Sequence, residues 1–230
     1  MMKSFEIVLV LALCLSLSQM AFAKILFQDD FESEQIGKEP SKWEYDPSAE
    51  VTDIAEIIED PVEGDKCMSH FGGYVVENSK EWKDYVVEFD WMFTEAGSNE
   101  SVAFRYQDAN KFYQLSKRGD MQSIHIYMYN GSWNQIASGN FPVNVNVWYR
   151  VQLSVKGPTF TAKMKEKDDQ TAFSDIGPVV DVEDKTYDKG GFSTAYYGPI
   201  DDVLIGESEA DILAVKPASK LTTTWGALKL

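Results

Sequence analysis

Cysteine is nearly absent from this sequence. Only two cysteines occur among 230 residues, Cys14 and Cys67, and Cys14 lies in a segment that we expect to be removed. The single remaining thiol excludes an internal disulfide, so the folded chain must be stabilised by a packed core, with or without a bound ion. We expect Cys67 to be a buried free thiol, and a disulfide between two copies of the chain is the alternative.

Basic and imidazole side chains are scarce as well. Lysine and arginine together number 21 against 37 aspartates and glutamates, which gives a net charge of −16, and there are two histidines. Such an excess of carboxylates repels phosphate backbones and anionic lipids, which argues against nucleic acid and anionic membranes as partners. No spacing of histidines and acidic residues resembles a catalytic zinc site. Nucleophile elbows and phosphate-binding loops are missing too.

The one long apolar run stands at the N-terminus. Lys3 precedes the apolar segment 7–17, and Ala21-Phe22-Ala23 follows it as a small-x-small cleavage pattern. The run is shorter than the ~20 residues that a membrane-spanning helix needs, so the pattern predicts a signal peptide over residues 1–23. No later stretch is apolar enough to span a membrane. We therefore expect the protein to be secreted, or to reside in the periplasm or at the cell surface.

The mature chain has the sequence pattern of an all-β domain. Helical periodicity is weak, and the best helix candidate is Val51–Glu59. In Asp84–Phe93 the odd-numbered residues are apolar or aromatic and predict a core-facing side. Asn130-Gly131 predicts a tight hairpin turn. Further strands are predicted at 101–106, 111–116, 122–129, 133–137, 148–155, 159–165, 192–197 and 201–205. This spacing is typical of an antiparallel sandwich or barrel over residues 24–207, with 208–230 a loosely attached extension.

Several motifs occur in an order that is found in a known superfamily. They are Phe27–Glu32, Ser101–Tyr113, Val147–Val151, Gly190–Phe192 and Ile200–Val203. In this order and spacing the chain resembles the concanavalin A-like (laminin G-like) jelly-roll superfamily of secreted bacterial proteins. The resemblance implies an all-β, two-sheet antiparallel jelly-roll sandwich. Its relatives include sugar-binding modules, laminarinase-type glucanases and domains labelled 3-keto-disaccharide hydrolase, so fold transfers more safely than function.

The resemblance raises the question of whether this chain carries the catalytic carboxylates of the glucanases in the superfamily. Laminarinase-type enzymes carry E-x-D-x-(x)-E on one strand, with the first carboxylate as nucleophile and the last as acid/base. Glu88 and Asp90 match the first two places, but Met92 or Phe93 stands in the third. Retaining glycosidases need both carboxyl groups, about 5–5.5 Å apart. We therefore predict a non-catalytic protein. The enzyme alternative, a glycoside hydrolase, would need Glu88 or Asp90 beside His125 in a deep pocket.

A ligand-binding surface is predicted on the polar face of the strands. Alternation places six side chains on that face, which are Glu88, Asp90, Arg105, His125, Tyr127 and Tyr129. Sugar recognition uses flat aromatic rings together with polar groups that bind hydroxyl pairs. We predict a carbohydrate-binding or adhesive domain whose partner is a polysaccharide or other glycan. The alternatives are aromatic residues that only pair across strands, and a structural interaction domain of the cell envelope.

A structural calcium ion is the one cofactor that the resemblance implies. In that superfamily the first and last strands lie side by side and often hold calcium, which prefers oxygen ligands. Asp29, Asp30, Asp201 and Asp202 occupy the matching positions. The alternative is that these side chains only cap strand ends.

Overall fold

A computed structural model describes residues 23–49, 54–69, 72–196 and 198–215. The predicted signal peptide, apart from its last residue, lies outside the described residues, and so does the part of the predicted extension from residue 216. Cys67 is buried as a free thiol, as expected. No helix in the described part of the chain is long and apolar enough to cross a membrane.

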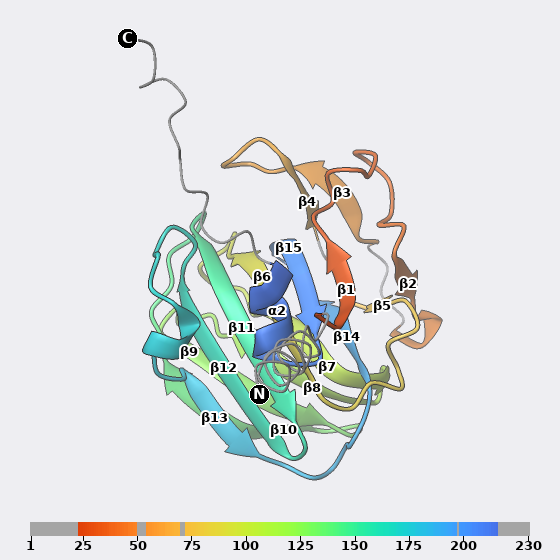
Figure 1. Ribbon diagram of the computed structural model, residues 1–230, viewed down its shortest axis with the longest axis vertical. Coiled ribbons are helices and arrows are strands. Elements are labelled where there is room, and N and C mark those ends of the chain that lie inside the picture. The colour runs from red at the N-terminus through yellow and green to blue at the C-terminus, as the bar shows by residue number, and fades with distance from the viewer. Residues whose placement is uncertain (1–22, 50–53, 70–71, 197, 216–230) are drawn as a thin grey trace, which may run out of the picture.

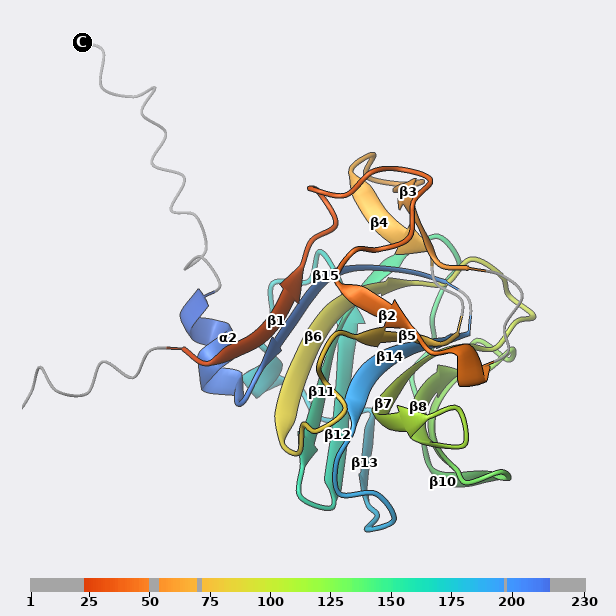
Figure 2. The same cartoon turned by 90° about the vertical axis from the view of Figure 1, so that its right-hand side faces the viewer.

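Two antiparallel sheets pack face to face (Figure 1; Figure 2 shows them edge-on). Sheet A has the order β13 (Val180–Glu183), β12 (Thr159–Glu166), β11 (Trp148–Lys156), β6 (Tyr85–Met92), β15 (Pro199–Gly206), β4 (Lys66–Ser69) and β3 (Glu56–Glu59), and β1 (Ile25–Asp29) pairs with β15. Sheet B has the order β10 (Trp133–Asn140), β9 (Ser123–Tyr129), β8 (Lys111–Lys117), β7 (Glu100–Asp108), β14 (Gly191–Tyr196), β5 (Tyr74–Val76) and β2 (Trp43–Tyr45). The predicted two-sheet sandwich is confirmed.

The core lies between the two sheets and follows the alternation of the strands. The odd-numbered residues from Tyr85 to Phe93 are all fully buried in it, as the sequence predicts. Ile124 and Ile126 of β9 and Val151 and Leu153 of β11 meet them from the neighbouring strands. Burying a side chain of this size stabilises the fold by roughly 1.5–3 kcal/mol. The neighbouring residues of each strand must therefore point to an outer face.

Two predicted features differ from the structure. Glu56–Glu59, part of the predicted helix, is strand β3, because pairing with β4 places Ile57 in the core. The segment after residue 207 is not loose throughout. Helix α2 (Glu209–Val215) packs on the outer face of sheet A, where Ile212 is buried against Val86 and Leu204. Tertiary packing overrides the local sequence pattern at β3, whereas α2 forms from residues of high helix propensity and is held in place by the contacts of Ile212.

Candidate functional site

The outer face of sheet B carries aromatic side chains from β9. Since Ile124 and Ile126 point into the core, His125, Tyr127 and Tyr129 point outward, as predicted, and all three are partly exposed. The β9–β10 hairpin places Trp133 directly opposite Tyr129 in the register. Gly131 has a φ of 90°, which the tight turn requires and glycine adopts without strain.

These rings continue across the sheet as one cluster. The ring centroids of Tyr129 and Trp133 are 4.5 Å apart, those of Phe112 and Tyr129 5.2 Å, and those of Tyr106 and Phe112 5.6 Å. Tyr127 meets Trp133 edge-on at 6.0 Å. Tyr106 and Phe112 are buried, whereas Trp133 is 47% exposed. The buried rings therefore support an exposed one that a ligand can reach.

Two adjoining cavities lie on this face. The first, of 490 Å³, is lined by Ser98, Asn99, Ser101, Gln114, Ser116, Arg118, Tyr127, Trp133 and Tyr196. The second, of 270 Å³, lies over Tyr106, Phe112 and Tyr129 and shares Trp133 and Tyr196 with the first. Tyr196, at the end of β14, is 49% exposed. We call this surface the aromatic groove.

The floor of the first cavity is polar but uncharged. Gln114, Ser101 and Ser116 are buried there, and Gln114 Nε2 donates a hydrogen bond of 2.6 Å to Ser101 Oγ. His125 lies beside this cavity, with Nε2 2.8 Å from Ser123 Oγ. Burial lowers the pKa of His125, and so does the charge of Arg118. The imidazole is therefore neutral at neutral pH, and the floor offers hydroxyl and amide groups of the kind that bind sugar hydroxyls.

A buried ion pair holds one wall of the groove. Lys117 Nζ donates hydrogen bonds to the backbone oxygens of Glu95 (3.0 Å) and Ser98 (2.9 Å), and lies 3.7 Å from Glu100 Oε1. Glu100 accepts hydrogen bonds from Thr94 N (3.1 Å) and Ser98 Oγ (3.0 Å). Both Lys117 and Glu100 have no exposed surface. The pair therefore fixes the loop 94–99, which supplies Ser98 and Asn99 to the cavity.

Arg105 does not belong to the groove, which corrects the sequence prediction. Its φ of 48° breaks the alternation of β7 and turns its side chain inward. The guanidinium is 1% exposed and donates to the backbone oxygens of Tyr187 and Gly157, each at 2.8 Å. Gly190 permits this bend, because a Cβ there would lie 2.2 Å from the carbonyl carbon of Arg105. Arg105 is a structural residue at the edge of the sandwich.

Glu88 and Asp90 are also separated from the groove. They lie on the outer side of β6 in sheet A, whereas His125, Tyr127 and Tyr129 belong to sheet B. Both carboxylates are 1% exposed. Arg150 Nη1 donates to Asp90 (3.0 Å), and Gln152 Nε2 donates to Glu88 (2.9 Å). The six predicted ligand residues thus do not form one surface, and the acid–histidine pocket that the enzyme alternative needs is not formed by these residues.

The four aspartates predicted to bind calcium do not gather into a cluster either. β1 and β15 do pair, with Asp29 opposite Val203. Asp29, however, is held by Lys42 Nζ (2.8 Å) and Trp43 Nε1 (3.1 Å). Asp201 is buried and pairs in register with Asp90. Among the described residues, the acidic side chains close enough to share a cation are Asp60, Glu63 and Asp65.

No protein-family model matches this chain, and no curated protein matches it. Solved structures do match. Domain 4 of the extracellular GH43 arabinanase AbnA from Geobacillus stearothermophilus, determined in complex with arabinotriose, aligns with a TM-score of 0.52 and 14% identity over 81% of this chain and 94% of that chain. A protein of unknown function with a galectin-like fold from Bacillus subtilis aligns with a TM-score of 0.52 and 13% identity over 80% and 96%. This chain has the galectin-like jelly-roll fold.

Within this jelly roll, several groove residues escaped the sequence prediction. Trp133 could have been found, because the Asn130-Gly131 turn places it opposite Tyr129. Gln114 lies opposite Tyr127 in the β8–β9 pairing and could have followed from the same reasoning. Nothing in the sequence around Tyr196 indicates that it lies in the groove, because its partner strand β7 is distant in the sequence.

Proposed function

We propose that this protein is a non-catalytic carbohydrate-binding domain that binds a glycan in the aromatic groove. The observation that carries the proposal is the pair of half-exposed rings, Trp133 and Tyr196, beside a cavity with the polar floor of Gln114 and Ser101. Aromatic faces stack on the apolar C–H side of a sugar ring, and amide and hydroxyl groups bind its hydroxyls. The groove offers both within one 490 Å³ cavity, large enough for a sugar residue.

Two further considerations support this proposal. The arabinanase domain that shares the fold was determined with an arabinotriose bound. The carboxylates of sheet A are already bound to Arg150, Lys167 and Gln152, which suits a structural role better than an acid/base role. We also propose that the chain is exported after cleavage behind Ala23, because its N-terminal pattern is that of a signal peptide. Mass spectrometry of the mature protein should then find Lys24 as its first residue.

Replacing Trp133 by alanine is expected to weaken glycan binding at least about tenfold, which corresponds to about 1.4 kcal/mol. Tyr127→Ala and Tyr129→Ala should weaken it as well, because each removes a ring of the same cluster. The wild-type chain is screened against a glycan array, and affinities for the best ligand are then measured by isothermal titration calorimetry.

Tyr45→Ala is the matched control, since Tyr45 is an exposed tyrosine of sheet B that lines neither cavity. Its affinity for the glycan should equal that of the wild type. The absence of binding to every glycan tested would refute the proposal. Equal affinities of the wild type and Trp133→Ala would show that the groove is not the binding site.

A further inference from the structure

We propose that the aromatic groove selects sugars that carry a negative charge, a carboxylate or a sulfate, and that Arg118 binds this group. The inference rests on the proposed function and adds the chemical class of the ligand. It follows from the position of Arg118 in the cavity, from its lack of a carboxylate partner, and from the composition of the groove.

Arg118 differs from the other arginines of the chain, Arg105 and Arg150. Arg105 Nη2 lies 3.6 Å from Asp84 Oδ1, and Arg150 Nη1 lies 3.0 Å from Asp90 Oδ1. Within the described residues, no carboxylate forms an ion pair with Arg118. An unpaired guanidinium is unexpected in a chain with 37 acidic residues. Arg118 is therefore available to an anionic group from outside the protein.

The lack of acidic residues in the described lining of the groove also favours an anionic ligand. None of the described residues that line its two cavities is an aspartate or a glutamate, although the chain as a whole carries a net charge of −16. Arg118 is the charged residue among those lining the first cavity. Since no carboxylate of the described residues lines the cavity beside it, an anionic sugar would meet attraction there while the acidic surface elsewhere repels it.

The placement of Arg118 also suits a sugar that stacks beside it. Its guanidinium lies over the ring of Tyr127, 5.4 Å from the ring centroid, and this cation–π contact orients the side chain. A planar guanidinium presents paired N–H groups that match the oxygens of a carboxylate or sulfate. A ring that stacks on Trp133 would then place a charged substituent within the same cavity.

The test compares charged and neutral polysaccharides on the full chain. Polygalacturonate supplies carboxylates, a sulfated galactan supplies sulfates, and arabinan and unsubstituted galactan serve as neutral probes. In affinity electrophoresis or calorimetry at low salt, we expect at least a tenfold preference for one of the charged polymers. A preference for polygalacturonate would identify the bound group as a carboxylate, and a preference for the sulfated galactan would identify it as a sulfate.

Arg118→Gln should reduce this preference to within about twofold, and Arg118→Lys should retain part of it. Lys156→Gln, a matched change of charge at an exposed site on sheet A, should leave the preference unchanged. Equal affinity for charged and neutral polymers, or a preference that survives in Arg118→Gln, would overturn the inference while leaving sugar binding intact. Binding to none of the polymers would instead contradict the proposed function.

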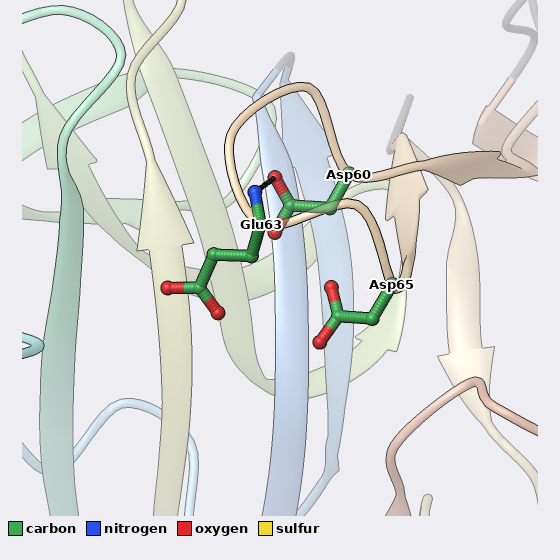
Figure 3. A group of neighbouring side chains, drawn as sticks. All are labelled: Asp60, Glu63 and Asp65. Carbon is green, nitrogen blue, oxygen red and sulfur yellow. Dashed lines mark hydrogen bonds between the residues drawn. The ribbon is translucent and has the colours of Figure 1, made fainter.

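A second inference concerns the turn between β3 and β4, and it is independent of the groove. Asp60, Glu63 and Asp65 each offer a carboxylate oxygen there, and these oxygens lie within 4.8 Å of one another (Figure 3). We infer that this turn binds a divalent cation, with Ca²⁺ as the best match. Calcium holds its oxygen ligands at about 2.3–2.6 Å, so two ligands of one ion are separated by up to about 5 Å.

Asp60 supplies the observation that points to a ligand. The residue is 3% exposed, and its Oδ1 accepts hydrogen bonds from Val62 N (2.7 Å) and Glu63 N (3.1 Å). Its Oδ2 is buried without a hydrogen-bond partner among the described residues. A buried carboxylate oxygen without a donor is costly and rare. Lys167 Nζ, 2.7 Å from Glu63 Oε2, offsets one of the three charges, and a cation would offset the others.

Calorimetric titration of the chelator-treated chain with CaCl₂ tests this site. We expect one site per chain and at least a tenfold weaker affinity in Asp65→Asn, an exposed position where folding is not at risk. Asp60→Asn should lose binding altogether. Asp30→Asn, which removes a carboxylate at the position expected from the sequence, should bind like the wild type. No binding, or an affinity that falls in Asp30→Asn but not in Asp65→Asn, would overturn the assignment.

Discussion

Lys117→Met is expected to lower the free energy of unfolding by about 3–5 kcal/mol, because it leaves the buried carboxylate of Glu100 without its cation. The same change removes the hydrogen bonds that Lys117 Nζ donates to Glu95 O and Ser98 O. The loop 94–99 should loosen, so glycan affinity should fall together with stability. Urea unfolding gives the first quantity and calorimetry the second.

The double variant Lys117→Met/Glu100→Gln is the control for this prediction. It removes both charges, so it should recover part of the lost stability, because no unpaired buried charge remains. It should not recover the glycan affinity fully, since the two loop carbonyls still lack the ammonium donor. A single variant as stable as the wild type would show that the pair contributes nothing to the fold.

Asp201→Asn is expected to raise the free energy of unfolding at pH 8 by at least about 2 kcal/mol. A carboxyl group whose pKa is higher in the folded state than in the unfolded chain costs about 1.4 kcal/mol of stability for each pH unit between the two pKa values. Burial, with a further contribution from the charge of Asp202, raises the pKa of Asp201 from 3.8 to about 8. The folded state therefore keeps its proton at pH values where the unfolded chain is ionised. The stability that the protonated Asp201 contributes is complete below pH 4 and is lost as the pH rises through 8.

Urea unfolding from pH 5 to pH 9 measures this effect. The wild type should lose stability over this range, and Asp201→Asn should lose less. An asparagine still accepts the hydrogen bond of 2.7 Å that Asp202 N donates to Asp201 Oδ1, so the substitution changes charge more than geometry. Asp202→Asn, at the exposed neighbouring position, should show a smaller change. Parallel pH profiles for the wild type and Asp201→Asn would contradict the prediction.

Alternation within single strands predicts an antiparallel sandwich or barrel and much of its core, and the ordered superfamily motifs decide in favour of the two-sheet sandwich. It placed Phe89 and Trp91 in the core and Tyr127 and Tyr129 on an outer face, and the structure agrees. Alternation describes one strand at a time, however. It does not say that β6 and β9 belong to different sheets. For that reason the sequence prediction assigns Glu88 and Asp90 to the same face as Tyr127 and Tyr129, and this assignment is wrong.

Other parts of the site depend on contacts between distant segments. Arg105 turns inward through one residue with positive φ, which a strand pattern does not reveal. Tyr196 reaches the groove through the pairing of β14 with β7. Lys117 is buried under a loop whose path no local sequence pattern determines. Sequence reasoning therefore found the central tyrosines of the groove and missed its walls.

The two ends of the packed domain have a consequence for how the groove is presented. Lys24 N, just before β1, donates a hydrogen bond of 2.9 Å to Asp211 Oδ1 of α2, and Figure 2 shows β1 and α2 together on the side away from β7 and β8. The groove lies on the opposite sheet. The first and last elements of the described domain therefore both lie on the far side of the sandwich from the groove, and neither of them covers it.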